Sequence, residues 1–292
     1  MMLAGDAADL VRRVDACIEA GRGAGTLVGI RTGEVVVVDD DGSGMRFQVR
    51  IAQNLVAKEA SDARQRVAPR FPFLPPFETG LFVGDLDDQH RLLLNKFCIS
   101  ARHVLVVTTE FEPQNRNLTA GALRCIIPCM DALHGLAFFN HGPDSGGTQP
   151  HFHVQIIPRR QTDQLDDVPL ADVIARHDHV PPLQTFTIDV WRFRHRAVRF
   201  SEQAPATPDA VEQLYLSMLG ALALDSATSY SWLLCSDFMV VVPRSSSHCM
   251  GIGVNSLAFA GCIFLKDESQ MTTLQQDVGG PMRLLERIAT QA

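Results

Sequence analysis

An α+β fold is the class that this sequence predicts. Strand-like and helix-like segments are mixed along the chain, without the regular β-α alternation that builds a parallel α/β sheet. The chain has 292 residues, of which 46% are hydrophobic and 20% are charged. This composition is ample for a core beneath an ordinary polar surface. The length fits one large domain or two small ones, and no internal repeat is visible.

The first segments of the chain predict a helix, a hairpin and a loop. Residues 6–20 carry apolar side chains at helical spacing and should form an amphipathic helix. Residues 34–38 and 45–51 are strand-like, and the Asp, Gly and Ser residues of 39–44 between them are typical of a turn. Four prolines in 69–76 predict a loop.

The middle of the chain predicts two strands, a helix and a further strand. Residues 92–108 are rich in β-branched and leucine side chains and are expected to form two strands. Residues 119–135 have the pattern of a helix, in which Pro128 predicts a kink. Residues 136–140 then form a short apolar strand that enters a glycine-containing loop.

The last third of the chain predicts a long strand over 186–200, a polar linker over 201–208 and a helix over 208–224. Two further apolar segments form a hairpin, and the chain is expected to end in a helix. The hairpin strands are residues 231–235 and 238–243.

The most informative segment is a predicted strand of β-forming residues that ends at Pro158. It follows a loop over 141–150 that contains three glycines, whose backbone amides could hold phosphates. Because side chains alternate along a strand, three polar groups share one face and three apolar groups share the other. The polar face is His151, His153 and Gln155, and the apolar face is Phe152, Val154 and Ile156. An imidazole held in such a place can attack phosphorus and carry the transferred group.

Two other interpretations of the histidine pair stay open from the residues alone. Histidines two apart on a strand are often metal ligands, and they also occur on solvated sheet faces. A metal site usually needs a third or fourth ligand at recognisable spacing, and no Glu follows the pair on this strand. The seven cysteines contain no C-x-x-C, and Cys125 and Cys129 are separated by a segment that includes Pro128. We therefore predict no metal site.

Residues 146–155, with the sequence GGTQPHFHVQ, resemble the active-site strand of diadenosine tetraphosphate (Ap4A) phosphorylases, which are also called ATP adenylyltransferases. These enzymes are relatives of histidine-triad proteins and of galactose-1-phosphate uridylyltransferase, with Gln in place of the third histidine. Three further parts of the chain carry the resemblance in the same order, so that it covers roughly residues 70 to 270. They are 93–97 with 103–108, then 138–142, then 241–245 with 253–261.

The resemblance implies a histidine-triad-like fold, in which helices flank a mainly antiparallel sheet, with a C-terminal extension domain. The expected division places the catalytic domain at 1–180 and the ATP adenylyltransferase domain at 181–292. The implied activity is phosphorolysis of Ap4A to ATP and ADP through an adenylyl-histidine. A histidine-triad-like hydrolase and a non-catalytic nucleotide sensor are the alternatives; the missing third histidine disfavours the first, and the presence of His153 and Gln155 disfavours the second.

By position in the family motif, His153 is the expected nucleophile, and its far ring nitrogen must donate a hydrogen bond to an acceptor. His151 is expected to shape the site and to offer its backbone carbonyl, and Gln155 to bind phosphoryl or bridging oxygens. The loop departs from the usual Gly-Ser-Ser-Gln, because Gly147 lacks a hydroxyl. The expected substrate-binding residues are Lys58, Asn95, Lys96, Asn140, Gly146, Gly147, Thr148, Gln149, Asn255, Ser256, Leu257 and Lys266.

Lysine is scarce in this chain. Of 26 basic residues only Lys58, Lys96 and Lys266 are lysines. A compact ammonium on a flexible stem can reach a phosphate where a planar guanidinium clashes. These lysines are therefore candidates for nucleotide contacts, and chance survival is the alternative.

Five other histidines are expected to have no part in the chemistry. His103 begins an apolar strand and is predicted to be a hydrogen-bonded core histidine. His141 and His248 are expected in loops, and His177 and His179 on the solvated surface.

The net charge and the lack of targeting signals limit the possible partners and the compartment. The net charge of −7 argues against nucleic-acid binding, which needs a basic face. The longest uncharged run, 245–265, contains Ser, His, Asn and three Gly, and is interpreted as a buried substrate-binding segment, not a membrane span. No apolar signal follows the early charges, and the odd cysteine count fits a reducing cytoplasm. The expected partners are small nucleotides. No cofactor is expected to be required, although Mg²⁺ could stimulate; the preferred dinucleotide, acceptor anion and oligomeric state stay open.

Overall fold

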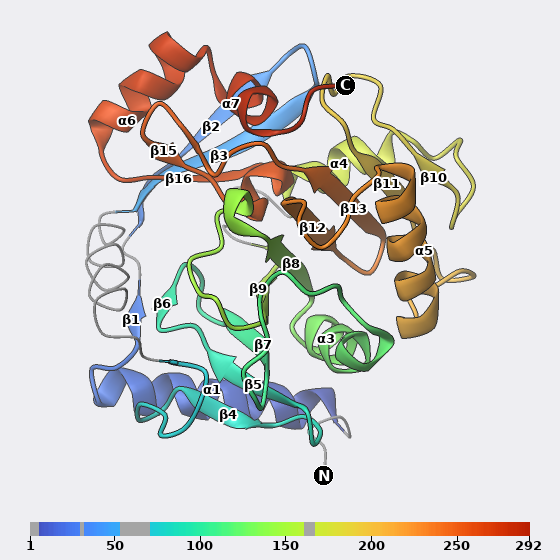
Figure 1. Ribbon diagram of the computed structural model, residues 1–292. Helices are drawn as coiled ribbons and strands as arrows, with labels where there is room; N and C mark the ends of the chain where they lie inside the picture. Colours follow the sequence, from blue (N-terminus) through green and yellow to red (C-terminus); the bar gives the residue numbers. More distant parts are fainter. Residues whose placement is uncertain (1–5, 30–31, 53–70, 161–166) are drawn as a thin grey trace.

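The structure is a computed structural model that describes residues 6–29, 32–52, 71–160 and 167–292. A nine-stranded sheet runs through the molecule in the order β10-β11-β13-β12-β8-β9-β7-β5-β4, and every neighbouring pair is antiparallel (Figure 1). The α+β class and the mainly antiparallel sheet are therefore confirmed. The nine strands are β4 (Phe82–Asp85), β5 (His90–Leu94), β7 (Val104–Thr108), β8 (Gly135–His141), β9 (His153–Pro158), β10 (Thr185–Phe186), β11 (Arg196–Arg199), β12 (Tyr230–Leu234) and β13 (Phe238–Pro243).

A smaller sheet of three strands contains the predicted N-terminal hairpin. Strands β2 (Thr32–Asp40) and β3 (Met45–Ala52) pair antiparallel, and β16 (Cys262–Leu265) adds to β3 in parallel. Because β16 comes from the far end of the chain, this sheet joins the two ends of the sequence. Two short pairs complete the strands: β1 (Val28–Gly29) with β6 (Phe97–Cys98), and β14 (His248–Cys249) with β15 (Ile252–Gly253).

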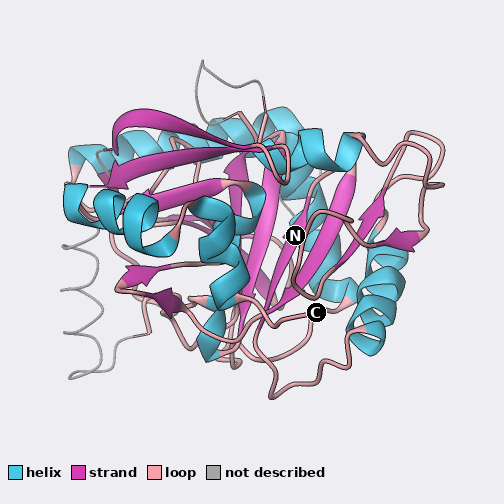
Figure 2. Cartoon of the chain, turned by 90° about the horizontal axis from the view of Figure 1, so that it is seen from above, coloured by secondary structure: helices cyan, strands magenta, loops and turns pink. Residues whose placement is uncertain are grey.

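Helices and the small sheet cover the two faces of the large sheet, and the long strands run between helices when seen from above (Figure 2). Helices α1 (Ala7–Gly23), α3 (Ala120–Ala132) and α5 (Pro208–Ala221) share one hydrophobic core with the sheet. Each begins where a side-chain oxygen caps the first turn, from Asp6, Thr119 and Thr207 respectively. A second core lies on the other face, between the sheet, the three-stranded sheet and five other helical segments. These are α4 (Pro169–Ala175), η2 (Ser256–Ala260), α6 (Glu268–Thr272), η3 (Thr273–Val278) and α7 (Pro281–Ile288).

Most elements predicted from the sequence are present. The helices expected over 6–20, 119–135 and 208–224 are α1, α3 and α5, and the C-terminal hairpin is β12–β13. The uncharged run 245–265 folds into short strands and η2 with many buried side chains. Among the described residues, none of the helices is both long and apolar enough to cross a membrane.

The prediction of one long strand over 186–200 is wrong. Only its two ends are strands, β10 and β11, and these pair with each other. Between them the backbone turns, because Trp191 N donates to Ile188 O at 2.9 Å and Ile188 N donates to the His195 ring at 2.7 Å. Ile188, Trp191 and Phe193 are still buried. Their apolar side chains pack into the core from irregular backbone. An apolar pattern of this kind therefore does not require a strand with a ladder of backbone hydrogen bonds.

Candidate active site

A cavity of about 820 Å³ lies beside β9. Its walls come from the segment 71–78, from the end of β5 and the residues after it, and from the glycine loop. It therefore collects segments that are far apart in the sequence. Nine of the predicted site residues line it: Asn95, Lys96, Gly146, Gly147, Thr148, Gln149, His153, Gln155 and Asn255.

Strand β9 alternates as the sequence predicts. Phe152, Val154 and Ile156 are fully buried in the core that contains α3. His153 and Gln155 consequently point to the opposite face and reach the cavity.

A backbone carbonyl holds the His153 ring in one orientation. Its Nδ1 lies 2.8 Å from the carbonyl oxygen of His151, and only a protonated Nδ1 can donate to that oxygen. The lone pair of the neutral ring is then on Nε2. The hydrogen bond to the His151 backbone is the one expected from the sequence. The ring lines the cavity and is 5% exposed, so the Nε2 side of His153 belongs to the cavity wall.

Gln155 is oriented by two neighbours. Its Oε1 lies 3.0 Å from His103 Nε2 and 3.4 Å from Asn95 Nδ2. Since Ile99 N donates to His103 Nδ1 at 3.4 Å, the ring proton of His103 is on Nε2 and is donated to Gln155. The Asn95 amide is fixed in turn, because its Oδ1 accepts from Phe97 N. With its oxygen occupied, Gln155 presents its NH₂ group to the cavity as a hydrogen-bond donor.

His103 is buried and hydrogen-bonded, as predicted for a core histidine. Its contact with Gln155 was not anticipated from the sequence. The signal was present in the strand register, because Leu105 pairs with Gln155 and side chains two apart share a face.

His151 lies behind the catalytic face and does not line the cavity. Thr108 Oγ1 donates to the Glu110 carbonyl, so it accepts from His151 Nε2 at 2.9 Å. The ring packs between Phe73 and Phe111, with centroid distances of 5.7 and 5.5 Å. Burial lowers the pKa of His151, so the ring is neutral near pH 7. Its contribution to the site is structural, through the carbonyl that holds His153.

Gln114 is a site residue that sequence reasoning missed. It is buried, its Oε1 accepts from His153 N at 2.7 Å, and its Nε2 donates to the carbonyls of Asn140 and His153 at 3.1 Å. The β8–β9 ladder ends at the pair Phe138–Gln155. The Gln114 side chain thus replaces backbone pairing where the two strands separate around the glycine loop. No periodicity marks such a loop glutamine.

The glycine loop needs glycine at its first cavity-lining position. Gly146 has φ +85°, and a Cβ there would collide with the carbonyl oxygen of Val254. The loop is therefore packed directly against Val254 and Asn255, which belong to the C-terminal part of the chain. This contact forms one wall of the cavity.

Three of the predicted substrate-binding residues lie behind that wall. Asn140, Ser256 and Leu257 are buried and do not line the cavity. Asn140 Oδ1 accepts from Ser256 N at 2.9 Å and from its hydroxyl at 2.7 Å, which fixes η2 against β8. Asn255 caps η2 by accepting from Leu257 N at 3.1 Å. These contacts hold Asn255 at the cavity.

The predicted lysines are placed differently from one another. Lys96 Nζ lies 2.8 and 2.7 Å from the two carboxylate oxygens of Glu78, and both residues line the cavity. Lys266 follows β16 and is not among the lining residues. Lys58 lies outside the described residues.

Some of the other predictions for histidines need correction. His141 is not a loop residue: it ends β8, is fully buried and stacks on Tyr230 with ring centroids 4.2 Å apart. His248 is exposed, but in the short strand β14. His177 is half-buried against Phe186, whereas His179 is exposed as predicted.

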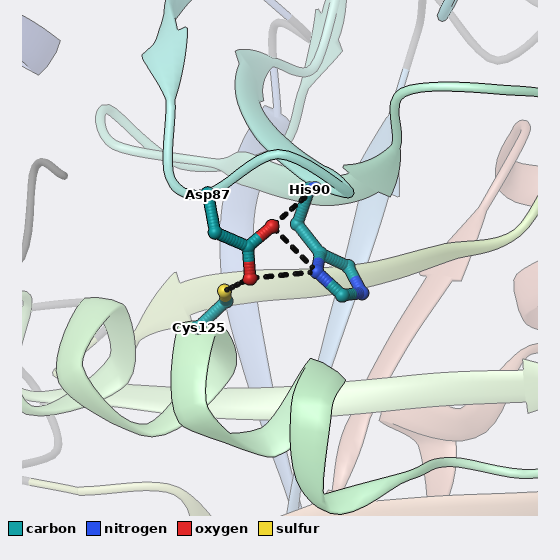
Figure 3. Close-up of side chains that lie close together, drawn as sticks. All are labelled: Asp87, His90 and Cys125. Atoms are coloured by element: carbon teal, nitrogen blue, oxygen red, sulfur yellow. Dashed lines mark hydrogen bonds and ion pairs between the residues drawn. The ribbon is translucent and has the colours of Figure 1, made fainter. Parts of the chain in front are cut away.

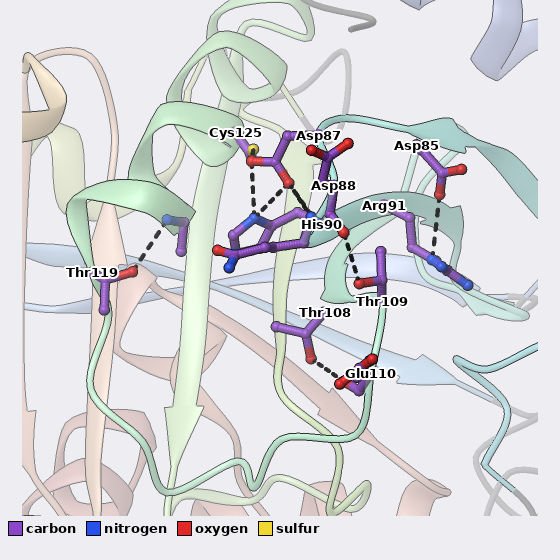
Figure 4. A network of polar contacts seen from close by, with 12 residues as sticks. Asp85, Asp87, Asp88, His90, Arg91, Thr108, Thr109, Glu110, Thr119 and Cys125 are labelled. Carbon is purple, nitrogen blue, oxygen red and sulfur yellow. Dashed lines mark hydrogen bonds and ion pairs between the residues drawn. The ribbon is translucent and has the colours of Figure 1, made fainter. Parts of the chain in front are cut away.

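Within the described ranges, one group of metal-ligand side chains comes together, Asp87, His90 and Cys125 (Figure 3). The Asp87 carboxylate accepts from His90 Nδ1 at 3.0 Å and from Cys125 Sγ at 3.1 Å, and also from the backbone N–H groups of Gln89 and His90. Burial, followed by Asp87, raises the pKa of the Cys125 thiol, so it keeps the proton that it donates. The group closes the β4–β5 turn and ties it to α3, within the wider polar network of Figure 4. We interpret it as structural.

A buried histidine whose Nδ1 donates to a backbone carbonyl lies beside a glycine loop and an amide donor, an arrangement that suits nucleophilic group transfer. Comparison with known proteins gives the family. Residues 3–176 match the Ap4A phosphorylase N-terminal domain, and residues 189–291 match the ATP adenylyltransferase C-terminal domain. The chain belongs to the Ap4A phosphorylase family.

Curated and solved relatives agree with this assignment. The chain is 28% identical over 269 residues to diadenosine 5',5'''-P1,P4-tetraphosphate phosphorylase 2 of Saccharomyces cerevisiae, with 80% of each chain covered. It is 27% identical over 220 residues to the protein APA1 of the same yeast, with 67% of each covered. The crystal structure of yeast Apa2 with AMP superimposes with a TM-score of 0.80 and 28% identity, and that with Ap4A with 0.78 and 25%; each covers 97% of both chains.

Proposed function

We propose that this protein catalyses the phosphorolysis of Ap4A to ATP and ADP, with His153 as the nucleophile. The observation that carries the proposal is the hydrogen bond from His153 Nδ1 to the His151 carbonyl, which leaves the Nε2 lone pair on a ring that lines the cavity. Membership of the Ap4A phosphorylase family supports the substrate. The yeast relative whose structure contains Ap4A supports it further.

The reaction proceeds in two displacements at phosphorus. His153 Nε2 attacks the α-phosphorus, the bond to the bridging oxygen breaks, and ATP leaves with that oxygen. Inorganic phosphate then attacks the adenylyl-histidine, the N–P bond breaks, and ADP leaves as the neutral ring is restored. Two in-line steps give ping-pong kinetics and net retention at phosphorus.

The surrounding residues would bind the phosphate chain. The Gln155 NH₂ group would donate to the phosphoryl oxygens as charge shifts onto them. Gly146, Gly147, Thr148 and Gln149 would hold phosphates, and Lys96 would meet one by leaving Glu78. Lys58 and Lys266 are proposed as further phosphate contacts by resemblance, and Asn140, Ser256 and Leu257 as supports of Asn255. No cofactor is needed for these steps, although Mg²⁺ could stimulate by binding the polyphosphate.

We further propose a division of labour between residues 1–180 and residues 181–292. The first part carries His153 and the glycine loop, and the second completes the cavity through Asn255. Strand β12 pairs with β8, so both parts share the large sheet. A reducing compartment such as the cytoplasm is proposed because all seven cysteines are free.

Product analysis tests the function. The purified protein is incubated with Ap4A in the presence and absence of phosphate, with the His153→Ala variant as control. Phosphate-dependent release of equal ATP and ADP, absent in the variant, is the expected result. AMP formed without phosphate would indicate a hydrolase. Binding of Ap4A with no turnover would indicate a sensor.

A further inference from the structure

Arg244 is a buried guanidinium that joins the glycine loop to the segment around Val254; the contact of these two segments forms one wall of the cavity, which we call the phosphate wall. It directly follows β13 and is 4% exposed. Its Nη1 donates to the carbonyl of Ser145 at 3.1 Å and to the hydroxyl of Ser231 at 3.0 Å. Its Nη2 donates to the carbonyls of Ser246 at 2.8 Å and Val254 at 2.9 Å. All four acceptors are uncharged.

Two of these acceptors directly precede cavity residues. Ser145 comes before Gly146, and Val254 comes before Asn255. The planar fork of one arginine therefore fixes the spacing between the glycine loop and the C-terminal segment, which already touch at Gly146 and Val254. A side chain with a single donor point could not bridge both carbonyls in this way.

The charge of Arg244 has no carboxylate in hydrogen-bond contact among the described residues. Asp144 acts on it only through its field, and the Asp144 side chain accepts from Ser229. The face of the Phe259 ring, whose centroid lies 5.3 Å from Arg244 Cζ, is the other partner of the guanidinium, and burial still lowers the pKa of Arg244 to about 9. The group is still a cation at pH 7, and its field is weakly screened in a dry interior. A polyanion bound at the adjoining loop would add negative charge within reach of this field.

We propose that Arg244 is a positioning residue for the phosphate loop and that its buried charge favours ligands with longer phosphate chains. The inference rests on the proposed binding of nucleotides in this cavity. Arg244 differs from Lys96, whose charge is paired with Glu78 and faces the cavity directly. Arg244 lies behind the phosphate wall and does not line the cavity. Its replacement should therefore change both the geometry of the glycine loop and the preference of the cavity for negatively charged ligands.

The chain offers a matched control in Arg50. This residue is also 4% exposed, and burial also lowers its pKa. It donates to Gln48 at 2.7 Å and lies 5.9 Å from the Phe264 ring centroid, in the small sheet. Arg50 does not line the cavity. Arg50→Met therefore removes a comparable buried guanidinium without touching the phosphate wall.

The test compares binding of adenosine and ATP by calorimetry in wild type, Arg244→Met and Arg50→Met. Arg244→Met should lower the ratio of ATP affinity to adenosine affinity by about tenfold or more. Arg50→Met should leave the ratio within about twofold. An equal ratio in wild type and Arg244→Met would overturn the proposed role of the charge.

Arg244→Lys separates charge from position and covers the case in which Arg244→Met does not fold. The variant keeps the cation but cannot bridge Ser145 and Val254. Its affinity ratio should stay within about threefold of wild type, while kcat for Ap4A falls about tenfold or more at similar KM. Wild-type kcat in this variant overturns the positioning role, and a collapsed ratio overturns the charge role. If wild type bound ATP but did not cleave Ap4A, the proposed reaction would fail while the binding ratios still decided the role of the charge.

Discussion

Gln155 Oε1, on β9, accepts a hydrogen bond across 3.0 Å from Nε2 of His103, the residue directly before β7. The contact decides which end of the Gln155 amide faces the cavity. An amide that was free to flip would present its oxygen to the phosphoryl oxygens half of the time, and the two would repel each other. His103 thus selects the orientation in which the Gln155 NH₂ group faces the cavity.

His103→Ala should lower kcat about tenfold and change KM less than threefold, because Gln155 loses orientation and keeps its place. Steady-state kinetics with Ap4A measures both constants. The half-buried His177, replaced by Ala, is the control and should leave kcat unchanged. If His103 acts through Gln155, the double variant with Gln155→Ala should be no slower than Gln155→Ala alone. Fully additive losses would show that His103 has another role.

Gln114→Glu should damage both stability and turnover. The substitution replaces the Nε2 donor by a carboxylate oxygen that faces the carbonyls of Asn140 and His153. Leaving such buried groups unpaired costs on the order of 1–3 kcal/mol of unfolding free energy. Urea unfolding and kcat are the measurements, and the exposed Gln184→Glu is the control for the added charge. A variant as stable and as active as wild type would show that Gln114 does not hold His153 in place.

Lys96→Arg should weaken catalysis although it conserves charge. A planar guanidinium would stay paired with the carboxylate of Glu78 in a bidentate contact, whereas the ammonium can move to a phosphate. We expect a loss of about tenfold to a hundredfold in kcat/KM, or roughly 1.5–3 kcal/mol. Lys266→Arg provides the comparison, and the cavity geometry predicts a smaller effect there. Wild-type kinetics in Lys96→Arg would make chance survival the better explanation of this lysine.

His195 predicts a pH dependence of stability. Its Nδ1 donates to the Phe193 carbonyl and its Nε2 accepts from Ile188 N, so the folded state needs the neutral ring. Burial lowers the pKa of His195 from 6.5 to about 4. As pH falls below 6.5 the unfolded chain takes up the proton first, so stability is complete above that pH and declines toward pH 4. The full loss is about 3 kcal/mol.

Urea unfolding at pH 7, 6, 5 and 4 measures that slope. His195→Gln should be less stable at pH 7 but should show a flatter decline, because Gln does not titrate. The exposed His248→Gln should keep the wild-type slope. Parallel curves for His195→Gln and wild type would contradict the assignment, and the decline would then belong to other buried histidines such as His141 and His151, whose pKa values burial also lowers.

Local patterns were sufficient for part of this structure. The alternation around His153 and Gln155 predicted the polar face of β9 correctly. A shift of the strand register by one residue would turn Phe152 and Val154 out of the core, so the apolar pattern fixes which face is polar. Side-chain oxygens at Asp6 and Thr119 mark helix starts that the sequence also indicates. These features depend on neighbours a few residues away.

Features that depend on distant contacts could not be predicted in this way. Gln114 and Arg244 act on carbonyls of segments 26 and 99 residues away, at Asn140 and Ser145. His141 is buried because Tyr230, from the other half of the chain, stacks on it. The strand expected over 186–200 failed for the same reason: Arg194 N bonds to Thr290 O instead of to a neighbouring strand.

Gln155 is the residue expected to decide the acceptor. Its amide cannot act as a general base, so it cannot activate water against the adenylyl-histidine, whereas a histidine there could. Gln155→His should therefore raise hydrolysis relative to phosphorolysis and yield AMP in place of ADP. Gln155→Ala should slow both routes by roughly 10²–10³, because it removes the donor to the phosphoryl oxygens.

The ratio of AMP to ADP at fixed phosphate measures how the adenylyl-histidine divides between hydrolysis and phosphorolysis. A second substitution, at His103, makes this experiment more specific. In wild type the His103 ring donates to the Gln155 oxygen; an imidazole at that position could accept from His103 through one nitrogen and would present N–H to the cavity through the other. Base catalysis by the new histidine then requires the other tautomer, so combining Gln155→His with His103→Ala should raise the AMP fraction further. An unchanged ratio in both variants would place acceptor choice in a phosphate pocket formed by the glycine loop and Lys96, where the wall held by Arg244 sets the distance from phosphate to the adenylyl group.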